Sequence, residues 1–389
     1  MGNTPNIRFK GFTDDWEQRK LGDIITEYKE TVDSDCTLPI LTSSKTEGVI
    51  LQEEHFGRKQ QHDITGYNIL PRNYCTYRNR SDGVDFTFNI NKCCDKGIIS
   101  KFYPVFSGKN SDVFFLSLVL NNSEEVVREI AYTCTGTGQK VLSFLDLQKM
   151  KVRVPNFDEQ KEIAAYFESL DHIITLHQRK CDETKKLKKY MLQKMFPQKN
   201  EKKPEIRFAG FTDDWEQRKL EDVVEFLDTI RKPLEGAKRT PGPYPYYGAS
   251  GIVDYVDGYL FDEELVLLSE DGANITDRNY PVCFLASGKY WVNNHAHVLR
   301  TKDGNENKFI CNSLERKDYK QYNSGMAMPK LNQEVCRSIP INCPSFDEQK
   351  KIGAYLNNLD NLITLHQRKC DEIKEVKKFM LQNMFPQKG

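Results

Sequence analysis

Residues Asp158 to Met195 contain no glycine or proline, and their apolar or small residues recur at alternating steps of four and three. These positions are Ile163, Phe167, Leu170, Ile174, His177, Cys181, Thr184 and Met191, with Lys188 filling one slot. The spacing returns near the end of the chain at Ile352, Leu356, Leu359, Ile363, His366, Cys370, Ile373 and Met380. A 4-3 pattern sustained over about five heptads is typical of a coiled-coil seam. The sequence therefore predicts two long helices that pack along such seams.

The ends of the first helix also leave signals in the sequence. Asp158 is the predicted N-cap, and Met195-Phe196-Pro197 ends the helix because proline cannot continue the hydrogen-bond ladder. A helix of ~38 residues is a rod about 57 Å long. Two such rods joined through a whole domain are expected to form an antiparallel pair with a pseudo-twofold axis. The alternative is that each helix packs on its own domain.

The two helices belong to an internal repeat that organises the whole chain. Residues 7–21 (IRFKGFTDDWEQRKL) and 206–220 (IRFAGFTDDWEQRKL) are identical at fourteen of fifteen positions. Residues 157–199 and 346–388 are identical at 31 of 43 positions. The segments between these blocks, 135 and 125 residues long, show no convincing similarity to each other. The chain thus carries two different variable segments on one duplicated frame.

Each variable segment is large enough to be a domain. The first halves carry short alternating runs broken by glycine and proline, and the second halves look helical at Val113–Ala131 and Lys308–Tyr319. The predicted fold class is α/β (α+β), with two recognition domains separated by two long helices in an antiparallel coiled coil. The predicted boundaries are 1–156 for the first domain, 157–199 for its helix, 200–205 for a linker, 206–345 for the second domain and 346–389 for its helix.

Two stretches interleave basic, amide and aromatic residues without an acid. They are residues 72–80 (RNYCTYRNR) and residues 287–297 (SGKYWVNNHAH). Arginine and lysine pair with guanine edges or phosphates, asparagine pairs with adenine, and aromatic rings pack on bases or sugars. These stretches suit contact with DNA. A solvated strand edge guarded by positive charge would show the same composition.

Composition narrows the class of protein further. Lys+Arg and Asp+Glu both number 56, so the net charge is zero. This excludes a chain that binds nucleic acid through positive charge along its whole length, but it leaves room for local basic faces. No apolar run approaches the ~18 residues of a membrane span, and the start of the chain lacks a signal-peptide pattern, so a cytoplasmic protein is expected. Eleven cysteines without any C-x-x-C pattern indicate reduced thiols.

Candidate metal and redox residues have plainer structural interpretations. His295 and His297 could bind a metal with Cys283 or Cys311, but no second ligand pair lies at helix-turn spacing, so no metal is predicted. The matched residues His177, His366, Cys181 and Cys370 fall on the seams, where core packing explains them.

Familiar catalytic motifs are missing from the sequence. It has no phosphate-binding G-x-x-x-x-G-K-[ST], no G-x-S-x-G, no H-E-x-x-H and no N-P-P-aromatic motif. The pattern favours a chain that binds and positions other molecules over one that catalyses.

The whole arrangement resembles the specificity subunit of type I restriction–modification enzymes. The paired FDEQ motifs at 157–160 and 346–349, each close to a proline, match the P-x-x-E-Q start of that family's helices. Residues 135–140 (TGTGQK) resemble a family loop near the end of a recognition domain, and residues 247–251 and 293–297 are also family-like. In the second half, Ser324–Pro329 replaces the T-G-T-G-type loop, so equivalent contacts are in doubt there.

The resemblance implies a function. Each variable domain would read one half of a gapped, asymmetric target in double-stranded DNA through the major groove, with the coiled coil setting a gap of about one helical turn, ~34 Å. Two adenine-methyltransferase subunits would dock on the helices and supply S-adenosylmethionine and base flipping. Two restriction subunits would use ATP and Mg to translocate and cut unmodified DNA. The chain itself would bind no cofactor, no membrane and no metal, and would not be an enzyme.

The predicted DNA contacts of the first domain are Ser43, Ser44, Lys45, Arg78, Asn79 and Arg80. Those of the second domain are Tyr247, Ser250, Lys289, Tyr290, Asn293, Asn294, His295 and His297. Two other classes of function remain open from the sequence: a stand-alone coiled-coil scaffold, and a DNA-modifying enzyme with its own catalytic site.

Overall fold

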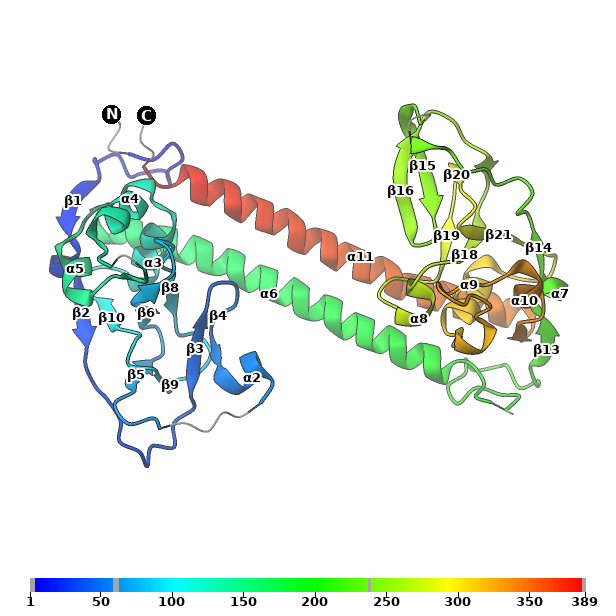
Figure 1. The fold of residues 1–389 in the computed structure, drawn as a ribbon, viewed down its shortest axis with the longest axis horizontal. Helices are drawn as coiled ribbons and strands as arrows, with labels where there is room; N and C mark the ends of the chain where they lie inside the picture. Colours follow the sequence, from blue (N-terminus) through cyan, green and yellow to red (C-terminus); the bar gives the residue numbers. More distant parts are fainter. Residues whose placement is uncertain (1–3, 59–62, 137, 200, 237–238, 387–389) are drawn as a thin grey trace. The chain divides into compact units, whose positions relative to one another are not determined.

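The computed structural model describes residues 4–58, 63–136, 138–199, 201–236 and 239–386. The chain forms two compact units, and each unit takes residues from both copies of the repeat (Figure 1). The first unit consists of Met1–Leu176 and Lys369–Gly389, and the second consists of His177–Arg368. Helix α6 (Phe157–Lys194) begins in the first unit and ends in the second, whereas α11 (Phe346–Asn383) does the reverse.

The other elements of the first unit are β1 (Glu17–Lys20), α1 (Leu21–Ile24), β2 (Ile25–Tyr28), β3 (Leu41–Ser44), β4 (Gly48–Leu51), α2 (Gln52–Phe56), β5 (Asn68–Pro71), β6 (Cys75–Tyr77), β7 (Arg80–Ser81), β8 (Phe88–Ile90), β9 (Lys96–Ile99), β10 (Val105–Gly108), α3 (Val113–Asn122), α4 (Glu124–Thr133), β11 (Lys140–Val141), α5 (Phe144–Lys149) and β12 (Lys151–Val154).

The other elements of the second unit are β13 (Glu216–Lys219), α7 (Leu220–Val223), β14 (Val224–Phe226), β15 (Pro241–Gly248), β16 (Gly251–Val256), β17 (Phe261–Asp262), β18 (Leu265–Ser269), α8 (Asn274–Asp277), β19 (Cys283–Ala286), β20 (Lys289–Val292), β21 (Ala296–Thr301), α9 (Asn307–Glu315), a 3-10 turn (Lys320–Tyr322), α10 (Gln333–Arg337) and β22 (Pro340–Cys343).

The two variable segments share a sheet topology despite their unlike sequences. A four-stranded antiparallel sheet has the order β2-β10-β6-β8 in the first unit and β14-β21-β18-β19 in the second. Different strands accompany it: the hairpin β3–β4 and the pair β5–β9 in the first unit, and a second sheet, β16-β15-β20-β17, in the second. The variable segments therefore keep one sheet and differ in the strands added to it.

The long helices pack along the predicted seams. In the first unit, Lys377 pairs with Asp171 and the Cys370 thiol points to the Ile174 carbonyl. In the second unit, Lys188 pairs with Asp360 at 2.6 Å and the Cys181 thiol points to the Ile363 carbonyl. In each set the residue numbers rise along α6 as they fall along α11, so the segments run antiparallel within both units. This confirms the predicted antiparallel packing.

The structure gives a reason for the one lysine in the predicted seam of α6. Lys188 occupies the slot where the apolar pattern lapses, and its ammonium is the group that binds the Asp360 carboxylate. The duplicated position Lys377 does the same with Asp171. A lysine can occupy a seam position when its stem packs along the apolar surface and its charge finds a partner.

The conserved amino-terminal block of each repeat fastens onto the helices. The Arg8 guanidinium makes two hydrogen bonds, of 2.6 and 2.7 Å, to the carboxylate of Glu159, whose side chain is fully buried. Arg207 and Glu348 repeat the arrangement in the second unit at 2.7 and 2.8 Å. The E-Q residues of the FDEQ motif therefore lie inside each unit, where the glutamate is neutralised by an arginine of the block.

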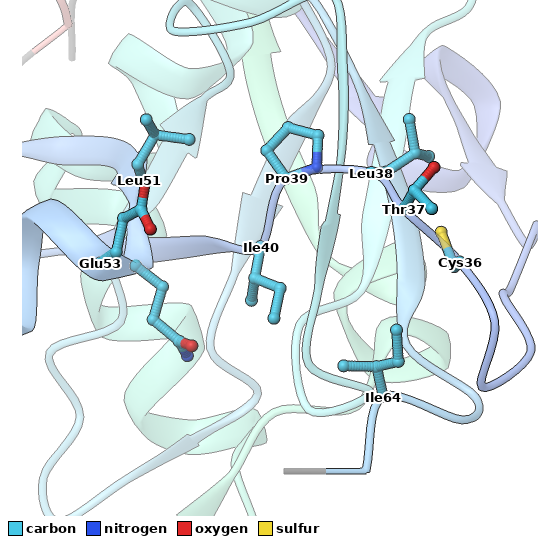
Figure 2. A pocket seen from close by; sticks show the side chains of 9 residues that line it. Cys36, Thr37, Leu38, Pro39, Ile40, Leu51, Glu53 and Ile64 are labelled. Carbon is cyan, nitrogen blue, oxygen red and sulfur yellow. The ribbon is translucent and has the colours of Figure 1, made fainter. Parts of the chain in front are cut away.

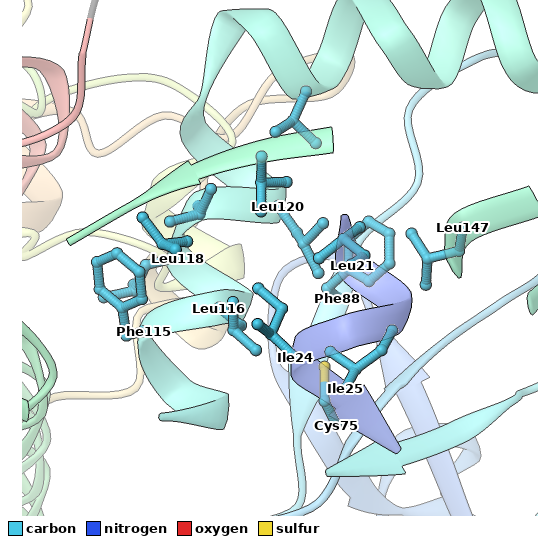
Figure 3. Packing of buried hydrophobic residues seen from close by; sticks show 14 of the residues in the cluster. Leu21, Ile24, Ile25, Cys75, Phe88, Phe115, Leu116, Leu118, Leu120 and Leu147 are labelled. Carbon is cyan, nitrogen blue, oxygen red and sulfur yellow. The ribbon is translucent and has the colours of Figure 1, made fainter. Parts of the chain in front are cut away.

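Aromatic residues close each core with a side chain from the other repeat. In the first unit, Trp16 packs edge-on against Phe115 and against Phe385, which follows α11. In the second, Trp215 packs against Phe309 and against Phe196, which follows α6. Figure 3 shows the cluster of buried residues around Phe115 in the first unit, where helix α3 lies against the sheet. Each core is thus completed by the end of the helix that began in the other unit.

Two local predictions need correction. Helix α6 begins at Phe157, and the Asn156 carboxamide, not Asp158, accepts the Glu159 backbone N–H at 3.0 Å. Asparagine caps as well as aspartate, and Asp158 instead faces Lys161 on the exposed side. The helical stretch predicted at 113–131 is two helices, because the extended backbone of Ser123 separates α3 from α4.

Candidate nucleic-acid interface

Four of the six predicted contacts of the first domain line one open hollow of about 490 Å³. Ser43 and Lys45 reach it from the β3–β4 hairpin, and Arg78 and Arg80 reach it from the segment after β6. The remaining lining comes from Ser81 to Thr87 and from Tyr103. Segments nearly 40 residues apart in the sequence thus present hydroxyl, ammonium and guanidinium groups to the same space.

The carboxamide of Asn89 links the hairpin to the sheet. Asn89 of β8 donates to the Ser43 hydroxyl at 2.8 Å and to the Ser44 carbonyl at 2.9 Å. The Ser44 hydroxyl in turn accepts the backbone N–H groups of Thr46 and Glu47, which closes the turn. The two serines therefore shape the hairpin, and Lys45 is exposed at its turn together with Thr46 and Glu47.

The three basic residues differ in how they are engaged. Lys45 pairs with Asp85 across the hollow, and the Arg80 guanidinium lies 4.6 Å from the centre of the Phe102 ring. Within the described part of the chain, no hydrogen bond or ion pair holds the exposed Arg78 guanidinium. Arg78 is therefore the basic group of this surface that is ready to bind an anion.

Asn79, between Arg78 and Arg80 in the sequence, is not among the residues that line the hollow. Its backbone N–H donates to the Phe102 carbonyl and its carbonyl accepts from Leu142, while its side-chain oxygen is buried without a hydrogen-bond partner among the described residues. Asn79 thus positions the two flanking arginines.

A second cavity is lined by residues that precede β3 and by residues at and after the end of β4 (Figure 2). It has a volume of about 430 Å³ and is lined mainly by apolar residues, including Leu38, Pro39, Ile40 and Leu51, with Glu53 at its edge. Its chemistry does not suit a polyanion. It brings together none of the predicted contact residues.

In the second domain, four loops meet at one end of the sheets. The hairpin between β15 and β16 turns through Ala249 and Ser250, and the Ser269 hydroxyl binds the Ala249 carbonyl. The backbone of Glu270 receives a hydrogen bond from Leu331 and donates one to His295. These bonds bring together residues 248–251, 269–272, 293–295 and 323–331.

Of the predicted contacts, Ser250, Asn294 and His295 are exposed at this end. The Nδ1 atom of His295 lies 2.9 Å from both carboxylate oxygens of Asp271, which orients the ring. Within the described residues the Asn294 carboxamide has no hydrogen-bond partner, whereas its backbone carbonyl accepts from Arg231. These side chains are placed to contact a ligand at the surface.

Three other predicted contacts of the second domain are buried. Tyr290 and His297 are fully enclosed, and Asn293 is 7% exposed. Tyr290 stacks on Phe261, and the Asn293 carboxamide accepts the His295 backbone N–H at 2.8 Å. The side chains of these three residues support the surface from beneath and do not face solvent, and their contact with DNA stays a prediction.

Tyr247 and Lys289 flank that buried layer. Tyr247 is half-buried and its ring stacks on Phe284, with centroids 5.9 Å apart. Lys289 is exposed at the start of β20, the end opposite to Asn293, and its ammonium lies 4.8 Å from the centre of the Tyr259 ring. Lys289 is therefore separate from the group formed by Asn294 and His295.

His297 is the centre of a buried charged network. Its Nδ1 lies 2.6 Å from an Asp228 carboxylate oxygen and its Nε2 lies 2.7 Å from the Leu331 carbonyl. Both partners are acceptors, so both ring nitrogens carry protons. Burial opposes this charge, but hydrogen bonds to Asp228 and Cys336 outweigh it and raise the pKa of His297 to about 10.

The same network contains the group of ligand atoms in the described residues that lie close enough to hold a metal: Asp228, Glu270 and His297. Both of its carboxylates already have cationic partners. Arg231 lies 2.5 Å from Glu270 and 3.5 Å from Asp228, and Lys330 lies 3.3 Å from Glu270. A protonated imidazole cannot ligate a cation, so this arrangement serves as an ion network that ties the four loops together.

Sequence reasoning missed several residues that build these surfaces. Asn89, Tyr103 and Phe102 lie well apart from the basic stretch of the first domain, and Asp271 and Arg231 lie apart from that of the second. Nothing in a short window of sequence marks them. Only the sheet pairing, β6 beside β8 and β18 beside β21, brings them to the predicted residues.

Two findings concern the chain as a whole. Among the described helices, none combines the length and the apolar character that crossing a membrane requires. The described cysteines are all free thiols, and burial raises the pKa of Cys75, Cys283 and Cys343.

Comparison with known proteins gives a consistent result. A family model described as "Type I restriction modification DNA specificity domain" matches residues 13–186 and 212–375. The chain is 35% identical over 147 residues to a type I restriction enzyme specificity subunit of Haemophilus influenzae, a match that covers 38% of each chain. It is 25% identical over 325 residues to the type I restriction enzyme MjaVIII specificity subunit of Methanocaldococcus jannaschii, covering 73% of this chain and 72% of that one.

A solved structure shares the fold. The type I restriction-modification system S subunit from M. genitalium aligns over 99% of this chain and 100% of its own length, with a TM-score of 0.69 and 14% identity. At 14% identity this alignment shows that the two chains share a fold and shows nothing more.

Proposed function

This chain belongs to the family of type I restriction–modification specificity subunits, and we propose that it recognises a two-part DNA target, one part through each variable domain. The observation that carries the proposal is the pairing of two unlike variable segments with one duplicated frame. Two variable domains that differ in sequence, held on two nearly identical helical regions, recognise two different DNA sequences. The target is therefore asymmetric, with a gap between its halves.

The recognition surfaces are the two groups of exposed polar residues. In the first domain, Arg78 supplies a guanidinium without an ion-pair partner among the described residues, beside Lys45 and Arg80. In the second, Ser250, Asn294 and His295 supply hydroxyl, amide and imidazole groups on one end of the sheets. Such groups read base edges or phosphates in DNA.

Catalysis in this proposal belongs to partner subunits. Two adenine-methyltransferase subunits bind the helices and use S-adenosylmethionine, and two restriction subunits use ATP and Mg to move and cut DNA. The chain itself acts in the cytoplasm as the DNA-reading part. Exposed apolar side chains on the long helices, such as Leu187, Leu362 and Phe379, offer surface for such partners.

The test is the adenine methylation of the genome in the source strain, in a strain lacking this gene, and in the deletion strain complemented with it. We expect one gapped, asymmetric motif to lose methylation on deletion and to regain it on complementation. Complementation with a chain whose residues 221–345 come from another family member should change one half of the motif only. An unchanged methylome on deletion, with the partner genes expressed, would overturn the proposal.

A further inference from the structure

The loop from Asn323 to Lys330 combines a rigid backbone with an apolar tip. Met326 is completely exposed, at 105% of the reference area, and Met328 is 61% exposed. This is the segment that stands in the second domain where the first has its T-G-T-G sequence. Its contribution to the surface is therefore different in kind from that of the first domain.

The backbone of this loop is held by a dense set of hydrogen bonds. The Asn323 carboxamide oxygen accepts from the backbone N–H groups of Gly325 and Lys330, both at 2.9 Å. Ser324 binds the Lys330 carbonyl through its backbone N–H at 2.8 Å and through its hydroxyl at 3.0 Å. A Cβ atom on Gly325 would lie 1.8 Å from the Met328 carbonyl oxygen, so only glycine fits there.

The loop is also fixed to the polar surface of the second domain. Gly272 donates its backbone N–H to the Pro329 carbonyl at 3.0 Å, and the Lys330 ammonium lies 3.3 Å from Glu270. Asp271 lies between these two anchors in the sequence. Its backbone forms an isolated β-bridge with Lys330, and its carboxylate orients the His295 ring. Met326 therefore projects from the same loop assembly that presents His295.

Met326 places an apolar side chain beside the polar groups proposed to read bases, and one apolar group in the major groove of DNA could contact it. In the major groove the thymine methyl is the apolar group on the base edges, and apolar side chains read it by contact. Hydrogen bonds to adenine N6 and N7 or to thymine O4 do not detect this methyl group. A rigid loop that exposes an unbranched side chain places it for such contact without loss of backbone freedom on binding.

We propose that Met326 is a specificity-determining residue that contacts a thymine methyl group in the half-site read by the second domain. The inference rests on the proposed function, and it adds a chemical class of contact that the polar candidates do not provide. It predicts that the second half-site contains an A·T pair whose recognition depends on the 5-methyl group.

The experiment uses the full-length chain with its methyltransferase subunits and a library of duplexes with randomised cores. The wild-type protein first defines both half-sites. Dissociation constants are then measured for the selected duplex, for the duplex with each thymine of the second half-site replaced by deoxyuridine, and for a scrambled duplex. The proteins are the wild type, Met326→Ala, Met326→Leu and Leu145→Ala, the last an exposed apolar residue of α5 in the first unit as the matched control.

We expect Met326→Ala to weaken binding of the selected duplex about tenfold, while Met326→Leu and Leu145→Ala stay within about twofold of the wild type. One deoxyuridine should weaken wild-type binding about fourfold, the effect of exposing one methyl group, and should have no further effect on Met326→Ala.

Each contrary result has a separate meaning. If the wild type selects a site but Met326→Ala binds it as tightly, or loses affinity equally for scrambled DNA, the role of Met326 is overturned while the proposed function stands. Capture of a protein partner by this loop, with DNA binding unaltered, has the same consequence. If the wild type selects no site, the proposed function fails and this inference fails with it.

Discussion

The Nδ1 atoms of His177 and His366 lie 3.1 Å apart, on facing seam positions of α6 and α11. One of the two Nδ1 atoms carries a proton and donates it, and the other accepts it. The contact therefore requires that only one of the two Nδ1 atoms be protonated. Burial, followed by the charges of His177 and Lys180, lowers the pKa of His366 below its usual value. The seam thus contains a group that resists protonation.

Acid should therefore weaken the helix pair. A pKa that is lower in the folded state than the unfolded value of about 6.5 gives stability that is complete above pH 6.5 and is lost as the pH falls below it. We expect the unfolding midpoint to fall between pH 6.5 and pH 5, below the range over which the His297 contribution declines, and to fall less in His366→Leu. The control is His172→Leu, an exposed histidine on α6. A pH response that His366→Leu leaves intact would contradict this prediction.

His297 predicts the opposite slope for the second unit. Its pKa of about 10 lies above the unfolded value of about 6.5, so its stabilising contribution is complete below pH 6.5 and declines as the pH rises toward 10. Thermal unfolding followed between pH 6 and 9.5 should show this decline in the wild type. His297→Gln should unfold at lower temperature and lack the slope, whereas His295→Gln, at the exposed pair, should keep it. Equal slopes in wild type and His297→Gln would refute the assignment.

The buried ion pairs of the repeat should be necessary for folding. Arg8→Ala leaves the Glu159 carboxylate fully buried without its guanidinium, which should lower the free energy of unfolding by about 3–5 kcal/mol. Adding Glu159→Gln should recover part of that loss, since a neutral amide is less costly to bury than a charge. Arg19→Ala, at an exposed pair with Glu17, should cost less than about 1 kcal/mol in the same urea titration.

The Arg207–Glu348 pair offers an independent check in the second unit. Arg207→Ala should have the same effect as Arg8→Ala, because the bonding geometry is nearly the same. A loss for one variant and none for the other would show that the two ends of the repeat are not equivalent in energy.

Arg78 should contribute to DNA binding through its charge. Arg78→Ala should weaken binding of the selected duplex about tenfold and reduce the dependence of log Kd on log salt by about one. The matched control is Arg72→Ala, because Arg72 is already engaged by Asp95 at 2.7 Å and by the Lys92 carbonyl. Equal effects of the two variants would argue against a specific role for Arg78.

The sequence predicted the frame well because the frame is periodic. Burial follows the 4-3 positions through both helices, from Ile163 and Phe167 in one and from Ile352 and Leu356 in the other. Even the irregular Lys188 obeys the pattern, because its partner Asp360 comes from the facing helix. Because the helical region occurs twice in the chain, the 4-3 spacing could be recognised in two places.

The exposure of the predicted contact residues could not be read from the sequence, for a physical reason. Residues 287–297 pass from a surface turn into a buried strand and out again, so neighbours in one polar-looking stretch differ completely in exposure. His297 and His295 are two residues apart, yet one is enclosed in an ion network and the other faces solvent. That difference depends on Asp228 and Leu331, whose proximity only the tertiary structure creates.

The aromatic junctions have a consequence for half-length versions of the protein. Phe385 completes the core around Trp16 and Phe115, and Phe196 occupies the matching place beside Trp215. A polypeptide that holds only the first repeat still possesses both parts of a junction, an acceptor core at its beginning and a donor phenylalanine at its end. Two copies can therefore exchange these ends and form a homodimer with two identical reading domains, which would recognise a palindrome in place of an asymmetric site.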